Sequence, residues 1–344
     1  MDSSRTMLQY LQYHPNISRQ EIAEGIGFTE SEATLKRLIS KEIEKGNITV
    51  TGKARATRYR LSAQAHLTMP LDIDTYFLKD TDDRVMLTSF NFELIADQLP
   101  KMKLFSDEEM KRLNTAHSVF QEHLADISEF QYRKEMERLG IDLSWKSSQI
   151  EGNTYSLLET ERLLRESKTA DGKTKEEAVM LLNHKSTLRF ILDHKDYWKK
   201  LTIRDIVDVH ALLTKELSVD KGLRHRRVGI TGTNYHPLDN EFQIREAMQA
   251  SCDIINSKEN VFEKALLALL LFSYIQPFMD GNKRTARLTS NALLIAYGYC
   301  PLSFRSVDSI DYKKAMLLFY EQNNIHAFKQ IFISQYEFAT EEYF

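Results

Sequence analysis

Residues 276–287 read Gln276-Pro-Phe-Met-Asp-Gly-Asn-Lys-Arg-Thr-Ala-Arg287 and lie between two apolar runs. The first run, Ala265–Ile275, and the second, Leu288–Tyr297, each predict a buried helix. The loop between them combines an Asp-Gly turn signal with an Asn and three cations. Backbone N–H groups in the first turn of a helix lack partners, and the helix dipole favours negative charge there. The stretch therefore predicts a phosphate site, with an interhelical turn carrying solvated charges as the alternative.

Individual residues of this loop suit such a site. Gly281 lets the backbone approach a ligand closely, and Asn282 tolerates unusual dihedral angles. Arg284 and Arg287 are three residues apart, so they can share one face of the helix. Asp280 is the acidic residue available to hold a metal ion that bridges phosphates.

The whole stretch resembles the signature of the Fic family, His-x-Phe-x-Asp/Glu-Gly-Asn-Gly/Lys-Arg-x-x-Arg. The resemblance implies a helical enzyme that transfers AMP from ATP to a Ser, Thr or Tyr hydroxyl of a target protein. The family position of the general base is a His, whereas this chain has Gln276. The matching positions are Phe278, Asp280, Gly281, Asn282, Lys283, Arg284 and Arg287.

The resemblance also implies a role for each matching residue. Asp280 would ligate Mg²⁺, and the backbone of Gly281, Asn282 and Lys283 would cradle the phosphates of ATP. The guanidinium groups of Arg284 and Arg287 would grip the β- and γ-phosphates, while Phe278 would anchor the loop in the core.

Gln276 departs from the family at the position of the base. An imidazole has a pKa near neutral pH, whereas a Gln amide does not titrate there and is a very poor acceptor for a hydroxyl proton. Loss of a general base typically lowers a rate by roughly 10²–10⁴-fold. The sequence therefore predicts an ATP site whose transfer chemistry is impaired.

A second informative stretch, Ile141–Asn153, predicts a helix end, because Gly152 is a C-cap signal after Glu151. Beside the Fic resemblance it is similar to the inhibitory motif Ser/Thr-x-x-x-Glu-Gly/Asn, matched by Ser147, Glu151 and Gly152. The implied role of Glu151 is to pair with Arg287 and keep it from the γ-phosphate. An Arg–carboxylate pair is bidentate and directional, so a triphosphate must displace it or bind around it.

Residues 222–237 interrupt the helical pattern. Val228, Ile230 and Tyr235 flank the turn signal Thr231-Gly-Thr-Asn, which predicts a β-hairpin. The resemblance implies the flap of the family, which holds an extended target segment by strand addition. A surface hairpin without that role is the alternative.

Residues 1–62 resemble a winged helix-turn-helix, with three helical patterns followed by two strand patterns. We expect Ser18 and Thr29 to cap the second and third helices. The hairpin carries four cations without an acidic residue among them, which suits a wing that contacts DNA phosphates. The third helix has balanced charge, so a protein-contact or dimerisation module is the alternative. The cations are Lys53, Arg55, Arg58 and Arg60.

Composition limits the remaining possibilities. At 344 residues, with 42% hydrophobic and 28% charged residues, the chain has the make-up of a globular protein of two or more domains. The net charge of -3 gives no overall basic excess. Cys252 and Cys300 are far apart and predict neither a disulfide framework nor a zinc site. With no signal peptide pattern and no apolar run long enough to cross a membrane, we expect a cytoplasmic protein.

Together these patterns predict a mainly α fold in three parts: a winged helix-turn-helix over residues 1–62, a connector over 63–105, and a Fic-like core with a β-hairpin flap over 106–344. The inhibitory helix falls near 141–153. The expected activity is protein adenylylation with ATP and Mg²⁺, held off by Glu151. Dimerisation is common in that family, so a homodimer is a further expectation. The alternatives are a nucleotide-sensing transcriptional regulator, AMP removal or another phospho-transfer on the same fold, and a ligand-free relic.

Overall fold

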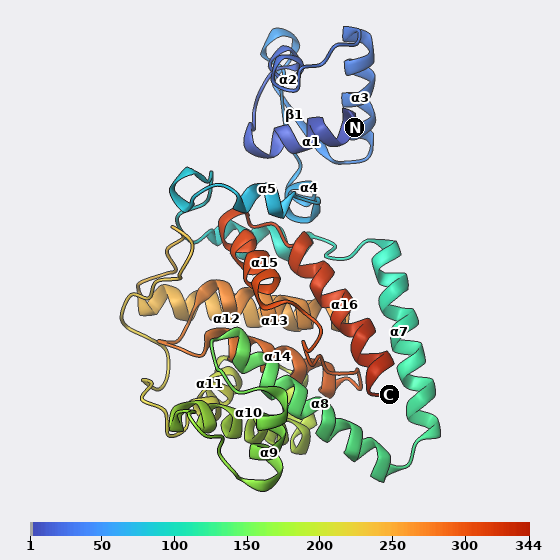
Figure 1. Cartoon of the computed structure of the whole chain (residues 1–344). Coiled ribbons are helices and arrows are strands. Elements are labelled where there is room, and N and C mark those ends of the chain that lie inside the picture. The colour runs from blue at the N-terminus through green and yellow to red at the C-terminus, as the bar shows by residue number, and fades with distance from the viewer. Residues whose placement is uncertain (1–2) are drawn as a thin grey trace.

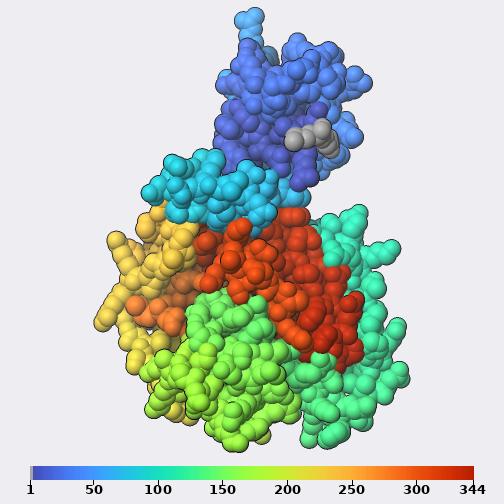
Figure 2. All heavy atoms as spheres, in the orientation of Figure 1, coloured from blue at the N-terminus to red at the C-terminus, as the bar shows by residue number. Residues whose placement is uncertain are grey.

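The computed structural model describes residues 3–344 and is mainly helical. Figure 1 shows a small N-terminal unit, a short layer of helices below it, and a larger helical body. In the space-filling view the N-terminal unit meets the rest of the molecule through that thin layer (Figure 2). Within residues 3–344 no helix is long and apolar enough to cross a membrane.

The N-terminal unit has its own hydrophobic core. It contains three helices and one antiparallel hairpin, which is the two-stranded sheet of the described residues. Met7, Leu11, Ile22, Leu35 and Ile39 form the centre of this core, so the helices pack on one another and on the hairpin. The elements are α1 Ser3–Tyr13, α2 Arg19–Gly25, α3 Glu32–Glu44, β1 Ile48–Thr51 and β2 Arg58–Leu61.

The predicted capping signals are correct for α2 and wrong for α3. The Ser18 hydroxyl accepts the Glu21 N–H, and the Glu21 carboxylate accepts the Ser18 N–H, which is a complete capping box. Helix α3 is instead capped by Ser31, whose hydroxyl accepts the Thr34 N–H. Thr29 lies two residues too early, because Ser31 is itself a good cap and directly precedes the first helical residue.

Residues 63–105 form short helices rather than a bare linker. Helix α4 is Ala63–Thr68 and α5 is Ile73–Phe77, and a π-helical stretch, Leu94–Gln98, leads into α6, Leu99–Lys101. Pro100 occupies the first turn of α6, where its missing N–H costs no hydrogen bond. Apolar side chains of this region, among them Leu94, Leu99 and Leu104, belong to the core of the larger body.

The larger body is built around α13. This helix is apolar on all sides, and 14 of its 15 residues are buried, as expected for a helix surrounded by others. Helices α12, α14 and α15 pack against it. The helices of the body are α7 Asp107–Asp126, α8 Glu129–Ile150, α9 Leu157–Glu166, α10 Lys175–Asp193, α11 Ile203–Leu213, α12 Glu241–Ser257, α13 Val261–Ile275, α14 Asn282–Ala296, α15 Ser309–Gln322 and α16 His326–Glu342.

Helix α8 begins well before the stretch at 141–153 that the sequence indicated. It runs without interruption through Gly140 to Ile150. A Cβ at Gly140 would lie 3.0 Å from Leu188 Cδ2 on α10, so the glycine allows these helices to approach closely. The close approach fixes the end of α8, and with it Glu151, against the body.

The predicted hairpin around Thr231-Gly-Thr-Asn does not form as a pair of strands. The turn is present, with Gly232 at φ +86°, but its two arms do not pair with each other. The His236 N–H instead donates to Thr88 O at 2.9 Å, and Ser89 and His236 form an isolated parallel bridge. The second arm therefore pairs with the connector, which leaves the first arm, 228–231, extended and unpaired.

Candidate active site

The loop at 276–282 begins where α13 ends. Gln276 caps α13 in the left-handed conformation, with φ 51° and ψ 60°. Two residues on, the side chain of Phe278 is buried. The Phe278 N–H donates to Asn282 Oδ1 and Asn282 Nδ2 donates to Phe278 O, both at 2.8 Å. This reciprocal pair of hydrogen bonds closes the loop and fixes the start of α14.

Gly281 is the N-cap of α14 and has φ +77°. Its conformation, rather than lack of space, favours glycine, because a Cβ there would meet only ordinary contacts at 3.5 Å or more. No side chain caps the first N–H groups of this helix. Unpaired amides at a helix N-terminus, with Lys283 beside them, form a site suited to an anion.

Arg284 and Asp280 form a pair at the edge of this site. Arg284 Nη2 donates to Asp280 Oδ2 at 3.0 Å, with Arg284 2% exposed and Asp280 66% exposed. Two other nitrogens of the same buried guanidinium, Nε and Nη1, have no partner. Buried charged donors without partners are costly in a folded protein, so they indicate a place for an absent acceptor.

Arg287 is completely enclosed by the end of α8. Its Nε donates to Ser147 Oγ, and its Nη2 donates both to Ser147 O and to Glu151 Oε1, each at 2.8 Å. The guanidinium also lies over the ring of Tyr312, 5.3 Å from its centroid. The two arginines therefore share the helix but face different partners.

Glu151 is the C-cap of α8, and Gly152 follows it at φ +100°, as the sequence indicated. Lys283 Nζ lies 3.6 Å from the second carboxylate oxygen of Glu151. Burial alone would raise the pKa of Glu151, but the charges of Arg287 and Lys283 outweigh it and hold that pKa below its usual value. Glu151 is therefore ionised at neutral pH and bridges two cations of the loop.

A pocket of about 400 Å³ opens beside these residues. One wall is the loop with the end of α8, a second is the unpaired arm 228–231, and a third is α15. Helix α15 contributes Lys313 and Tyr320, which the sequence did not single out. The loop and α8 residues that line the pocket are Ile150, Glu151, Gly152, Gln276, Met279, Asp280, Gly281, Asn282 and Lys283, whereas Arg284 and Arg287 are not part of its lining.

Gln276 faces this pocket but is tied to its own helix. Its Nε2 donates to Ser273 O at 2.7 Å, and the residue is 8% exposed. Its backbone carbonyl accepts the Nε–H of Arg224 at 2.6 Å. Arg224 also donates to Arg226 O and Leu238 O, so it joins the loop to the segment before Pro237. In the sequence Arg224 looked like part of a basic patch, and only its burial distinguishes it.

His210 of α11 packs against the loop and donates a hydrogen bond to it. Its ring stacks on Phe278 at 3.8 Å, and Nε2 donates to Asp280 O at 3.0 Å. Burial lowers the pKa of His210 to about 4, so the ring is neutral. Tyr312 and Asn291 are both fully buried, and Asn291 exchanges two hydrogen bonds with Leu302.

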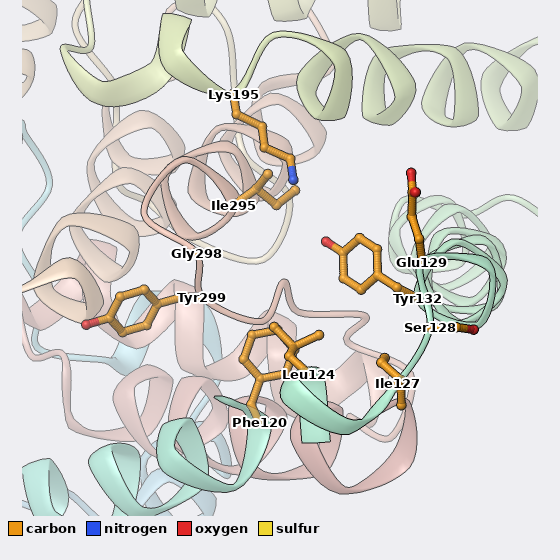
Figure 3. A pocket seen from close by; sticks show the side chains of 10 residues that line it. All are labelled: Phe120, Leu124, Ile127, Ser128, Glu129, Tyr132, Lys195, Ile295, Gly298 and Tyr299. Carbon is orange, nitrogen blue, oxygen red and sulfur yellow. The ribbon is translucent and has the colours of Figure 1, made fainter. Parts of the chain in front are cut away.

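A second pocket, of about 380 Å³, shares no residue with the first. It lies between the α7–α8 turn and the end of α14 (Figure 3). Lys195 Nζ is 5.9 Å from the centroid of the Tyr132 ring, and the other lining side chains are mostly apolar. Its lining lacks the convergent polar groups of the loop pocket.

The loop pocket fits a magnesium nucleotide in two respects. The unpartnered nitrogens of Arg284 and the uncapped start of α14 supply donors for phosphate oxygens. Across residues 3–344 no cluster of three His, Cys, Asp or Glu side chains could hold a metal. Mg²⁺ is often bound through one carboxylate together with substrate phosphates and water, and Asp280 suits that arrangement.

Comparison with known proteins agrees with this site. Residues 200–294, which include the loop, match the Fic/DOC family. It is 30% identical over 175 residues to a protein adenylyltransferase Fic of Nematostella vectensis, covering 49% of this chain and 40% of that protein. It is also 30% identical over 158 residues to one of Drosophila willistoni, covering 44% of this chain and 31% of that protein. The chain thus spans less than half the length of these relatives.

Solved structures share the fold of the larger body. Fic-1 from C. elegans has a TM-score of 0.60 and 21% identity, covering 69% of this chain and 72% of that one. A Fic domain containing signaling protein from Bacteroides thetaiotaomicron has a TM-score of 0.57 and 20% identity, covering 67% of this chain and 94% of that one. The Fic-like fold expected from the sequence is confirmed.

Proposed function

We propose that this chain is a protein adenylyltransferase that binds Mg²⁺-ATP at the start of α14 and is held inactive by Glu151. One observation carries the proposal. Arg287 is held by Glu151 and Ser147 with only Nη1 unpartnered, while the neighbouring Arg284 has two buried donors free at an uncapped helix start. A triphosphate would satisfy Arg284 at once, but Arg287 only after Glu151 moves away.

The pocket supports distinct tasks for its residues. Asp280 would hold Mg²⁺, which neutralises phosphate charge when bound. The amides of Asn282 and Lys283 would bind phosphate oxygens, and the two arginines would orient the triphosphate for attack on its α-phosphorus. Releasing Arg287 completes this set, so displacement of Glu151 activates binding in a productive pose.

The acceptor hydroxyl needs a base, and Gln276 does not supply one. Its amide carbonyl is a very weak proton acceptor, and its Nε2 is bound to Ser273 O. The chain as given would therefore bind ATP but transfer AMP slowly. The unpaired backbone of 228–231, on the wall of the same pocket, would accept an extended target segment by strand pairing.

Four proteins test the proposal: the chain as given, Gln276→His, Glu151→Gly, and the double variant. Each is incubated with a cell lysate and ATP labelled at the α-phosphate, and ATP binding is measured by calorimetry. We expect the double variant to transfer label roughly 10²–10⁴-fold faster than the chain as given. Arg284→Ala, added to the double variant, should remove both protein labelling and ATP binding. A double variant that neither labels protein nor binds ATP would show the proposal to be wrong.

AMP removal on the same site is a related candidate, supported by the carboxylate of Glu151 at the pocket wall. In that reaction Glu151 would orient a water toward the phosphorus instead of blocking ATP. Protein labelled by the double variant provides the substrate. Release of AMP by Gln276→His, but not by the double variant, would favour removal as the main activity.

DNA binding by the N-terminal unit is a second function that one observation favours. The charge of α3 looked balanced in the sequence, but Glu42 is buried, where it accepts hydrogen bonds from Ser4, Lys45 and Asn47. Glu32 pairs with Arg19. Six exposed cations of α3 and the hairpin form no ion pair within residues 3–344, and such cations suit phosphate contacts. They are Lys36, Arg37, Lys41, Lys53, Arg55 and Arg60.

A gel shift tests this second function. The probe is a duplex from upstream of the chain's own coding sequence, in salt of about 50 mM. The triple variant Lys36→Ala, Arg37→Ala and Lys41→Ala should bind more weakly and with a shallower salt dependence. Lys111→Ala, which removes an exposed cation of α7, is the control. No shift by the chain as given would favour a protein-contact module instead.

A further inference from the structure

The turn after the unpaired arm is held by the connector. The docking segment is defined as Val228–Thr231, and the clamp as Thr81–Ser89. Within residues 3–344 the backbone of the docking segment makes no hydrogen bond, and its half-buried Ile230 packs against the core of the larger body. The turn that ends it, 232–234, is bound by the clamp at several points. The connector lies against this part of the chain in Figure 2.

Arg84 is the centre of the clamp. Its Nη2 donates to Gly232 O at 2.7 Å and to Thr81 Oγ1 at 2.8 Å. Its Nη1 donates to both carboxylate oxygens of Glu321, at 3.0 and 3.1 Å. The side chains of Arg84 and Glu321 are 3% and 0% exposed, so this is a buried ion pair. One guanidinium therefore fixes the turn to the end of α15.

Two further hydrogen bonds join the chain at 234–236 to the clamp at the surface. Asn234 Nδ2 donates to Asp82 Oδ1 at 2.8 Å, and the His236 N–H donates to Thr88 O at 2.9 Å. At the other end of the same segment, Arg224 binds Gln276 O and Leu238 O. Arginines that bind backbone carbonyls thus hold the chain on both sides of the docking segment. Arg224 lies before it, and Arg84 binds Gly232 O after it.

The buried ion pair also reaches toward the N-terminal unit. The Tyr76 hydroxyl on α5 donates to Glu321 Oε2 at 2.7 Å, and Gln322 donates to that hydroxyl. In the same layer, α4 presents His66, whose ring lies 3.0 Å from Gln12 Nε2 of α1. The layer of short helices therefore contacts the N-terminal unit on one side and the ion pair of the clamp on the other.

We infer that Arg84 is a positioning residue for the protein substrate: through Gly232 it sets the place of the docking segment beside Gln276, without contacting the nucleotide. This inference rests on the proposed function, because it concerns presentation of the acceptor hydroxyl. A flexible docking segment would bind a target strand at a greater entropic cost. Loss of the clamp should thus weaken capture of the protein substrate and leave ATP binding unchanged.

The test variant is Arg84→Met with Glu321→Gln. Removing Arg84 alone would leave a buried unpaired carboxylate, which is strongly destabilising. The double change leaves no buried charge, keeps an apolar side chain over the Phe77 ring, where the Arg84 carbon now lies 4.9 Å from the centroid, and retains an acceptor for Tyr76. Hydrogen exchange of the full chain is then followed by mass spectrometry at the amides of Tyr235 and His236, which donate to Thr233 Oγ1 and Thr88 O just after the turn.

We expect exchange at Tyr235 and His236 to become about tenfold faster, because the turn beside them has lost a hydrogen bond from a charged donor. Amides of α14 should not change, which shows that the body remains folded. Asp82→Ala, an exposed change that removes only the Asn234 contact, should give a smaller increase of about two- to threefold. Its neighbour Asp83→Ala is the matched control and should have no effect. Unchanged exchange at Tyr235 and His236 in both test variants would contradict the inference.

The functional arm uses the Gln276→His, Glu151→Gly background with ATP labelled at the α-phosphate. With the clamp changes added, we expect labelling of lysate proteins to fall about tenfold while the ATP dissociation constant stays within about twofold. Equal labelling with and without the clamp changes would overturn the inference. If the background protein itself labels nothing, the proposed function has failed, and the exchange measurement still decides whether Arg84 positions the segment.

Discussion

A single carboxylate at the end of α8 connects the helix terminus to the chemistry of the pocket. Glu151 is the C-cap of α8, so its backbone position is fixed by the last turn of that helix. From there its side chain reaches Arg287 Nη2 at 2.8 Å and Lys283 Nζ at 3.6 Å. Because Arg287 is completely buried, this pair is little screened by solvent. Glu151 thus ends α8 and also occupies Arg287 beside the pocket.

The pH dependence of this pair can be predicted with its sign. The folded-state pKa of Glu151 lies below its unfolded value of about 4.3, so the unfolded state binds more protons as the pH falls. The stabilisation is fully present above that value and is lost as the pH falls through the folded pKa. Glu151→Gln should thus lower the free energy of unfolding by about 2 kcal/mol at pH 7, and by less near pH 3. Urea unfolding of both proteins across this range measures it, and a pH-independent difference would contradict it.

At the scale of elements, the approach of α8 to α10 depends on Gly140. Alanine at an exposed helix position would stabilise by roughly 0.5–1 kcal/mol relative to glycine. At Gly140 the added Cβ would lie 3.0 Å from Leu188 Cδ2, in a core where extra atoms force side chains out of their preferred rotamers. The packing cost and the helical gain act in opposite directions, and the buried environment makes packing the larger of the two.

We therefore expect Gly140→Ala to destabilise the protein by about 1 kcal/mol. In a Leu188→Val background, which lacks the contacting Cδ2 methyl group, Gly140→Ala should be neutral or stabilising. The double-mutant cycle, measured by urea unfolding, should show a coupling of about 1 kcal/mol between the two positions. Additive effects would mean that the Leu188 side chain moves aside freely.

At the scale of the whole molecule, features set by near neighbours in the chain could be predicted from the sequence, whereas features set by long-range contacts could not. The start of α2 after Ser18 followed from its capping pattern, because a cap is a contact between near neighbours in the chain. The Fic-like loop followed from a contiguous motif. The strand pairing around Gly232 did not, because the competing partner, 81–89, is far away in the sequence and has no strand pattern of its own.

Burial separates residues that look alike in the sequence. Arg224, Arg226 and Arg227 are neighbours in one basic run, yet Arg224 is 2% exposed and binds backbone carbonyls, while Arg227 pairs with Asp239 at the surface. The charge of α3 likewise looked balanced until Glu42 proved to be buried. Charge counts cannot anticipate this sorting, because it depends on which side of an element meets the core.

Buried histidines should dominate the stability of the whole chain in mild acid. Burial lowers the pKa of His184 to about 3, with nearby Arg287 and Arg284 adding to the effect, and lowers the pKa of His210 to about 4. Unfolded histidines bind protons near pH 6.5, so these two sites favour the folded state fully above that pH. As the pH falls from 6 to 4.5 they should together lower the free energy of unfolding by about 2.5 kcal/mol per pH unit. Urea unfolding at several pH values measures the slope. His184→Gln should remove about half of this contribution, while His123→Gln, an exposed change on α7, should leave it intact. Equal slopes in the unchanged chain and both variants would contradict the prediction.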